Sequence, residues 1–215
     1  MGMPAPISSL MSVAHGPIYR SRLRVLVGRI VPVLQENDAV LDVGCGVGTL
    51  GTAIMDDPKC PSGVKVTGLE RVARGGEPIP VVAYDGITFP MDDDSVDVVT
   101  IADVLHHEED PDRLLRECRR VARRMVIVKD HRRAGVLAQP RISFMDWAAN
   151  APYGVPCLYR YNTPEEWRAQ FGRVGLEIAE EVSGMSLYPP IVDQVFGGGL
   201  QYMAFTRPAV PGEPA

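Results

Sequence analysis

The chain has 215 residues, of which 46% are hydrophobic and 23% are charged. This composition is typical of a folded globular protein and excludes a disordered or collagen-like one. The net charge of -5 at pH 7 argues against a partner bound through a phosphate backbone. We expect one domain over residues 1–207, with a helical lead-in at residues 1–37 and a flexible tail at residues 208–215.

Cysteine usage and the lack of targeting signals suggest a compartment. Four cysteines (Cys45, Cys60, Cys118 and Cys157) are scattered without a C-x-x-C pair, so the sequence indicates neither a disulfide framework nor a metal site. The N-terminus lacks the regions of a signal peptide, and no segment approaches the ~20 apolar residues of a membrane helix. We therefore expect a soluble, cytoplasmic protein with no membrane span; the sequence leaves its oligomeric state open.

Strand and helix patterns alternate along the chain. Strands are predicted at residues 40–43, 64–70, 79–85, 95–102, 125–129, 176–182 and 201–206. Helical patterns occupy residues 21–34, follow Asp110-Pro111 and begin at the capping box of Thr163. Together these patterns predict an α/β fold: a doubly wound, Rossmann-like, mostly parallel sheet of about seven strands with an antiparallel C-terminal strand.

The helix predicted after Asp110-Pro111 carries five arginines on its outer face, which are Arg116, Arg119, Arg120, Arg123 and Arg124. Such a face is either a nucleic-acid stripe or a solvated surface. We favour the solvated surface and expect no nucleic-acid partner.

A glycine-rich turn follows the first strand. Residues 46–51 match G-x-G-x-x-G, and Glu70 lies 22 positions after Gly48 (70 − 48), near the ~20 expected for the ribose-binding acid of a dinucleotide fold. An NAD(P)-dependent oxidoreductase is therefore one alternative. The glycines already begin at Gly44, however, and Asp42 lies inside the preceding strand, which the dinucleotide pattern does not require. The chain also lacks the Tyr-x-x-x-Lys of short-chain dehydrogenases.

Five motifs occur in a specific order between residues 40 and 130. They are Leu-Asp-Val-Gly-Cys-Gly-Val-Gly at 41–48, Glu70, Asp85-Gly86, the stretch 89–99, and Asp-Val-Leu-His-His at 103–107. In this order they resemble the class I S-adenosylmethionine-dependent methyltransferases, of the small-molecule type related to the ubiquinone/menaquinone methyltransferases. The resemblance implies S-adenosyl-L-methionine as the cofactor.

The resemblance also implies a set of cofactor-binding residues. Glu70 would hold the ribose hydroxyls, Asp85 and Gly86 the adenine, and residues 103–104 would lie beside the methionine end. A carboxylate suits a vicinal diol because it accepts two charge-assisted hydrogen bonds. Asp42 would sit near the sulfonium or orient the loop. The full set is Asp42, Gly44, Cys45, Gly46, Glu70, Arg71, Asp85, Gly86, Asp103 and Val104.

Residues 71–80 depart from the family pattern, because they are too short and too rich in helix breakers for a full helix. We expect the third crossover helix to be missing or vestigial. Arg71 or Val72 would then cover the adenine.

Methyl transfer is an in-line displacement, so such an enzyme must align the reactants and exclude water. An oxygen acceptor also needs a base. His107 and His131 are the candidates, although each is equally well explained as a loop or hydrogen-bonding residue. A carbon acceptor needs no strong base.

Residues 132–161 are rich in aromatic side chains and are the predicted substrate cap. Phe144, Trp147 and Tyr153 would form apolar walls of the acceptor pocket, or else pack in the core. No Asp-Pro-Pro-Tyr-like sequence follows the fourth strand, which favours a small-molecule acceptor. Three functions stay open: a methyltransferase, an oxidoreductase, and a non-catalytic S-adenosylmethionine-binding module.

Overall fold

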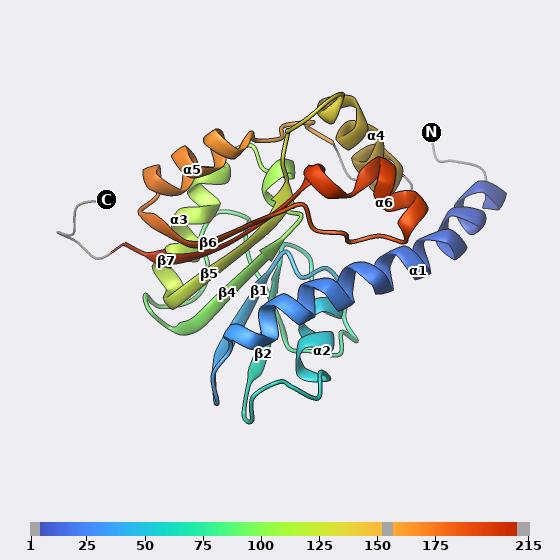
Figure 1. The fold of residues 1–215 in the computed structure, drawn as a ribbon. Helices are drawn as coiled ribbons and strands as arrows, with labels where there is room; N and C mark the ends of the chain where they lie inside the picture. The colour runs from blue at the N-terminus through green and yellow to red at the C-terminus, as the bar shows by residue number, and fades with distance from the viewer. Residues whose placement is uncertain (1–4, 152–156, 210–215) are drawn as a thin grey trace.

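A seven-stranded sheet forms the centre of the fold (Figure 1). The computed structural model describes residues 5–151 and 157–209, with side chains from residue 18 onward. The strands are β1 (Ala39–Val43), β2 (Lys65–Glu70), β3 (Val81–Ala83), β4 (Val96–Ala102), β5 (Ala122–His131), β6 (Leu176–Ser183) and β7 (Gln201–Pro208). Their order is β3-β2-β1-β4-β5-β7-β6, and β7 runs antiparallel to both of its neighbours. The predicted fold class is confirmed.

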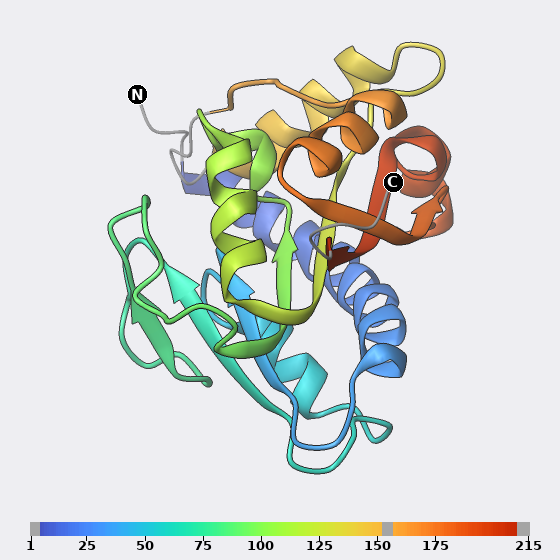
Figure 2. The ribbon, with the colours of Figure 1, turned by 90° about the vertical axis from the view of Figure 1, so that its left-hand side faces the viewer.

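Helices cover both faces of this sheet, as the two side views show (Figures 1 and 2). They are α1 (Ala5–Ile30), α2 (Thr49–Met55), α3 (Pro111–Val121), α4 (Ala138–Asn150), α5 (Pro164–Arg173) and α6 (Pro190–Phe196), with 3-10 turns η1 (Val31–Val33), η2 (Leu105–His107) and η4 (Gly198–Leu200). Helices α1 and α2 cover one face, and α3 and α5 cover the other. Helix α4 packs on α6. None of the helices in the described part of the chain has the length and apolar character that a membrane crossing requires.

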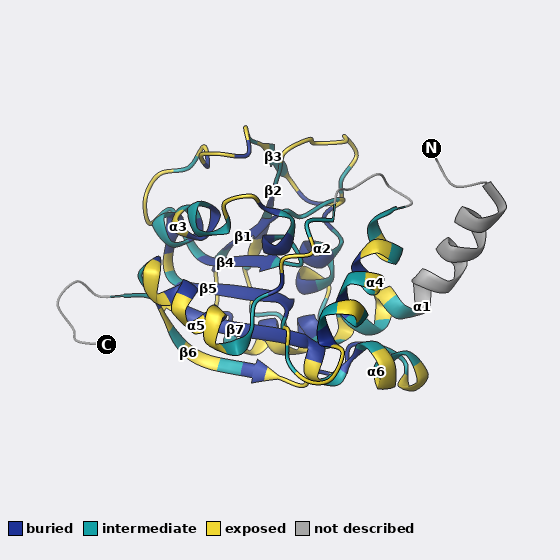
Figure 3. Cartoon of the chain, turned by 90° about the horizontal axis from the view of Figure 1, so that it is seen from above, coloured by how far each residue is buried: buried dark blue, intermediate teal, exposed yellow. Residues whose placement is uncertain are grey.

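Two hydrophobic layers follow from the alternation of side chains along the strands. Leu41 and Val99 pack with the helices α3 and α5, whereas Val40 and Val98 pack with α1 and α2. The central strands β1, β4, β5 and β7 are mostly buried, whereas the edge strands β3 and β6 and the outer helix faces are partly exposed (Figure 3). The central strands are therefore rigid supports for whatever lies at their ends.

The structure differs from the sequence prediction in three helices. Helix α1 begins well before residue 21 and ends at Ile30, because Pro32 has no N–H to continue it. Helices α4 and α6 lie in segments for which no helix was predicted. The connection at residues 71–80 contains no helix, as expected.

Four of the five arginines on the basic face donate to acceptors within the protein. Arg119 donates to the Gly175 carbonyl, and the other three pair with carboxylates of Glu117, Asp93, Asp97 and Asp38. These contacts brace α3 and the start of β5 against their neighbours.

Candidate cofactor and acceptor site

The candidate residues gather where parallel strands end. Strands β1 and β4 are neighbours in the middle of the sheet, and the chain leaves them in opposite directions, toward β2 and toward β5. Ligands of doubly wound sheets lie outside the carboxyl ends of the strands at such a switch point. The glycine turn follows β1, Glu70 ends β2, and Asp103 follows β4.

The glycine turn requires glycine for its shape and leaves part of its backbone accessible. Gly44, Gly46 and Gly48 have φ of 67°, 57° and 78°, a region that side chains disfavour. A Cβ atom on Gly44 would lie 2.4 Å from Val104 Cγ2, so the turn packs tightly there. A Cβ atom on Gly46 would meet nothing within 4 Å. Backbone groups near Gly46 therefore border open space that a ligand can occupy.

Asp42 places a buried carboxyl beneath this turn. Its side chain points to the α1 side of the sheet and is 2% exposed. Oδ1 accepts a hydrogen bond of 2.9 Å from the Thr100 hydroxyl, while Oδ2 has no partner among the described residues. Burial raises the pKa of Asp42 to about 6, against the opposing effects of Thr100 and of the Arg22 charge. An orphaned buried oxygen beside an open glycine turn fits a ligand that brings positive charge.

Glu70 connects β2 to the same turn. Its Oε2 accepts from the Gly46 N–H at 2.9 Å and its Oε1 from the Arg71 N–H at 2.8 Å. A carboxylate has about four acceptor positions, so two remain for a diol. Burial raises the pKa of the neighbouring Cys45 thiol to about 12, and the Asp42 and Glu70 charges add to the effect. The thiol is thus neutral.

The predicted adenine end is more exposed. Asp85 Oδ1 accepts from the N–H groups of Ile87 and Thr88, and these bonds lower the pKa of Asp85. Arg71 reaches from the end of β2 to Glu108, with Nη2 2.6 Å from Oε2, and passes beside Gly86. Arg71 therefore lies beside Gly86, which the resemblance assigns to the adenine.

Asp103 lies at the centre of a charge cluster with Arg22 and Lys129. Of these three residues, only Asp103 was predicted from the sequence. It has a left-handed φ of 57°, and its carboxylate accepts from Arg22 at 2.6 Å and from the buried Lys129 ammonium. Burial alone would raise the pKa of Asp103, but Lys129 and Arg22 hold it well below its usual range. Lys129 could have been noticed as a lysine inside an apolar strand. Arg22 carried no such signal.

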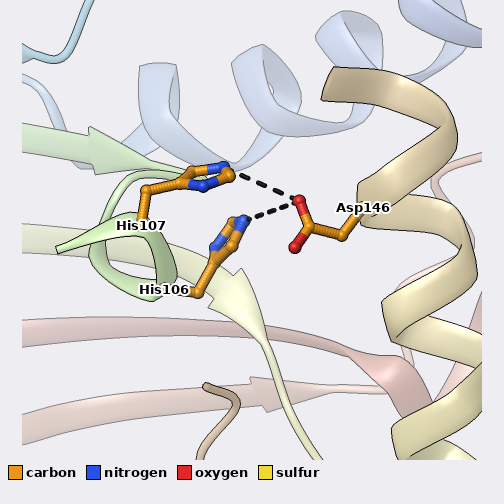
Figure 4. Close-up of side chains that lie close together, drawn as sticks. All are labelled: His106, His107 and Asp146. Carbon is orange, nitrogen blue, oxygen red and sulfur yellow. Dashed lines mark ion pairs between the residues drawn. The ribbon is translucent and has the colours of Figure 1, made fainter. Parts of the chain in front are cut away.

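Four histidine and aspartate side chains meet beyond the ends of β4 and β5. His106 Nδ1 lies 2.6 Å from Asp130 Oδ1, and the Nε2 atoms of His106 and His107 lie 3.6 and 3.7 Å from Asp146 Oδ1 (Figure 4). Burial would lower the pKa of His106, but Asp130 and Asp146 raise it to about 10. Asp146 also accepts from the Tyr161 hydroxyl at 2.6 Å. Asp146 and Tyr161 are not among the predicted site residues, since the sequence gives no sign that they approach His106.

His131 lies next to this cluster in a different electrostatic state. Its ring is buried, its Nε2 is 3.9 Å from Asp103 Oδ1, and its Nδ1 has no partner among the described residues. Burial, followed by the Lys129 charge, lowers the pKa of His131 to about 4. His131 is therefore neutral at pH 7.

The predicted substrate-binding aromatic residues lie apart from these charged groups. Phe144 and Trp147 are on α4 with exposed fractions of 55% and 46%, and Phe144 stacks on Phe196 of α6 at 5.9 Å between ring centroids. Tyr153 falls outside the described residues. Asp146, between them in sequence, points to the opposite, buried side of the helix.

The chain is similar to known proteins in sequence. A family model described as a methyltransferase domain matches residues 18–181. An uncharacterized 37.1 kDa protein in transposon TN4556 of Streptomyces fradiae is 33% identical over 132 residues, which cover 56% of this chain and 37% of that protein. The chain thus spans little more than a third of the length of this curated relative.

Solved structures share the fold at low identity. A chain from the complex between the Haloferax volcanii Trm112 methyltransferase activator and its partner matches with a TM-score of 0.66, 16% identity and 97% coverage of both chains. A SAM-dependent methyltransferase from Aquifex aeolicus matches at 0.60 and 17%, covering 94% of this chain and 98% of that chain. The [4+2]-cyclase SpnF matches at 0.62 and 19%, covering 88% and 81%. The same fold therefore occurs in a protein named for a different reaction.

Proposed function

We propose, from the premise that this chain belongs to the methyltransferase domain family, that it transfers a methyl group to a small-molecule acceptor. Its cofactor is S-adenosyl-L-methionine. The observation that carries the proposal is the glycine turn, whose backbone is open at Gly46 and whose neighbours are the orphaned Asp42 oxygen and the Glu70 carboxylate. This arrangement suits a nucleoside joined to a cation better than it suits a pyrophosphate, which the two acids would repel.

Different residues at the strand ends would bind the ribose, the adenine and the amino-acid end of the cofactor. When bound, the cofactor supplies an electrophilic methyl group on a sulfonium. Glu70 would accept from the ribose hydroxyls with the lone pairs that the backbone leaves free, and Asp85 with Gly86 would hold the adenine beneath Arg71. The amino-acid end would lie between the glycine turn and the Asp103 cluster, where Arg22 offers a guanidinium.

For an oxygen acceptor, His107 and His131 are the candidate bases. His106 is excluded from that role, because its Nδ1 lies 2.6 Å from Asp130 Oδ1 and its Nε2 faces Asp146 Oδ1 at 3.6 Å. His131 is neutral and so can accept a proton, although a pKa near 4 makes it a weak base. We expect His107→Gln to lower kcat more than His131→Gln if an oxygen is methylated, and neither to matter for a carbon acceptor.

Helix α4 and the segment after it are the proposed substrate cap. Phe144 and Trp147 form an apolar surface with Phe196, and Tyr153 completes the predicted set. We further propose a cytoplasmic location, which suits four cysteines that form no disulfide with one another.

Cofactor binding is the decisive experiment. Calorimetry of the purified protein should show saturable heat with S-adenosylhomocysteine and none with NAD. The reverse result would favour an oxidoreductase. Turnover of labelled cofactor against phenols, quinols and carboxylates then separates a methyltransferase from a binding module without catalysis.

Glu70 gives the sharpest variant for this site. We expect Glu70→Gln to weaken S-adenosylhomocysteine binding by about tenfold or more, since each charge-assisted hydrogen bond contributes about 1.5–3 kcal/mol. Glu177→Gln on the exposed side of β6 is the matched control and should bind as the parent does. Equal affinity in both variants would refute the ribose role of Glu70.

A further inference from the structure

We propose that His106, His107 and Asp146 form a binding site for one divalent transition-metal ion, and that zinc fits it best. Their three ligand atoms lie within 4.8 Å of one another. The two histidines come from η2 and the aspartate from α4, and all three side chains point to a common centre (Figure 4). The site does not depend on the proposed methyl transfer, and an ion bound there would occupy His107 and leave His131 as the candidate base.

The spacing of the ligand atoms is the first argument. Distances of 3.6 and 3.7 Å from the two Nε2 atoms to Asp146 Oδ1 exceed a hydrogen bond, for which about 2.7–3.2 Å is usual. Zinc binds imidazole nitrogen and carboxylate oxygen at about 2.0–2.2 Å, so two of its ligands at the tetrahedral angle lie about 3.4 Å apart. Adjacent ligands of octahedral Mg²⁺ lie only about 3.0 Å apart. The observed spacing favours the tetrahedral ion.

The surroundings of the ligands are the second argument. Asp130 Oδ1 lies 2.6 Å from His106 Nδ1, which fixes the ring so that its Nε2 faces Asp146. Tyr161 donates to Asp146 Oδ2 at 2.6 Å and Asn150 to Oδ1 at 2.7 Å. Histidine ligands of metals commonly donate their second nitrogen to a carboxylate in this way, and ligating carboxylates are themselves hydrogen-bonded.

A second possible ligand set, His106 with Asp130 and His131, is less suitable. The 2.6 Å contact between His106 and Asp130 is a direct hydrogen bond and leaves no room for an ion between those two atoms. Asp130 Oδ2 and His131 Nδ1 are nevertheless buried without partners among the described residues. Ordered water around a nearby ion would satisfy them.

The chemistry of the donors defines the ion. Two imidazoles and one carboxylate suit zinc and neighbouring transition metals rather than calcium or magnesium, which prefer oxygen ligands. Among the described residues the set supplies three protein ligands, one fewer than the four of a tetrahedral zinc ion. The His107 side chain is 18% exposed, whereas those of His106 and Asp146 are nearly inaccessible, so water would approach an ion from the side of His107.

The alternative without a metal is a protonated His106 held between Asp130 and Asp146. Titration of zinc into the chelator-treated full chain distinguishes the two. We expect one ion per chain by calorimetry, and the cobalt-substituted protein should show the intense visible absorption of tetrahedral Co²⁺. Absence of saturable binding, or only the weak absorption of octahedral Co²⁺, would overturn the proposal.

Variants locate the ion. His107→Gln and Asp146→Asn should each weaken zinc binding more than tenfold, and Tyr161→Phe about tenfold. The exposed Asp56→Asn is the control and should retain the parent affinity. Circular dichroism would verify that each variant is folded. Unchanged zinc affinity in folded His107→Gln and Asp146→Asn proteins would place the ion elsewhere and refute the site.

Binding of S-adenosylhomocysteine is measured on the same variants. We expect Asp146→Asn to keep S-adenosylhomocysteine binding, so a failure of the metal proposal and a failure of the proposed function give different results.

Discussion

Asp42 shows how a single buried side chain makes stability depend on pH. Its folded pKa of about 6 lies above the ordinary value of 3.8, because burial disfavours the carboxylate. The protonated form therefore stabilises the fold fully below about pH 4, and this contribution is lost as the pH rises through 6. A cationic ligand beside Asp42 would favour the carboxylate form and so offset this loss of stability.

We expect the Asp42→Asn variant and the parent to have the same free energy of unfolding near pH 4. At pH 7.5 the variant should have a free energy of unfolding higher than that of the parent by on the order of 3 kcal/mol. The asparagine stays neutral and can keep the bond from Thr100. Urea unfolding of the cofactor-free protein at the two pH values measures the difference. If the difference in free energy of unfolding between the variant and the parent were the same at both pH values, the raised pKa of Asp42 would be contradicted.

At the scale of elements, α5 is stabilised by a capping box that also supports the candidate site. The Glu166 N–H donates to Thr163 Oγ1 and the Thr163 N–H donates to Glu166 Oε2. The helix presents Trp167, whose Nε1 donates to the His131 carbonyl at 3.0 Å. Capping at one end of the helix thus helps to hold the end of β5.

Thr163→Ala should lower the free energy of unfolding by about 1 kcal/mol, because it leaves backbone donors of the first turn unsatisfied. Thr163→Ser keeps the hydroxyl and is the control, with a smaller loss. Urea unfolding checks both variants. Equal losses for alanine and serine would show that the cap contributes nothing.

The contrast between α5 and α4 explains which elements the sequence could predict. Helix α5 has a capping box and a proline at its first turn, so its start was predicted at the correct residue. Helix α4 begins after Leu137 without a side-chain cap, contains Pro140, and buries Asp146 through its partners Tyr161 and His106. Tyr161 and His106 reach Asp146 only through the tertiary fold, so the local sequence pattern does not reveal these contacts.

For the molecule as a whole, most of the site residues predicted from the sequence lie at strand ends, whereas Arg22, Asp146 and Tyr161, which come from other elements, were not predicted. Glu70 and Asp103 follow predicted strands, and the sheet brings both to the glycine turn. Arg22 is 81 positions from Asp103 in the chain, and only the path of α1 across the sheet brings them into contact. The position of α1 on the sheet depends on the packing of a whole hydrophobic layer. The periodicity of the sequence indicates which face of the helix is apolar, but not where on the sheet that face packs.

That contact provides a test of how α1 is joined to the sheet. Arg22 and Lys129 both face the Asp103 carboxylate, so two cations share one anion in a largely buried place. Asp103→Asn would remove the one carboxylate that both cations contact among the described residues, and should cost about 3–5 kcal/mol of stability. Arg22→Gln would leave Asp103 and Lys129 as a matched pair and should cost clearly less. Urea unfolding at pH 7 compares the free energies of unfolding of the two variants. A larger loss of stability in Arg22→Gln would mean that the apolar contacts of α1 around Arg22, rather than the charge balance at Asp103, hold the helix in place.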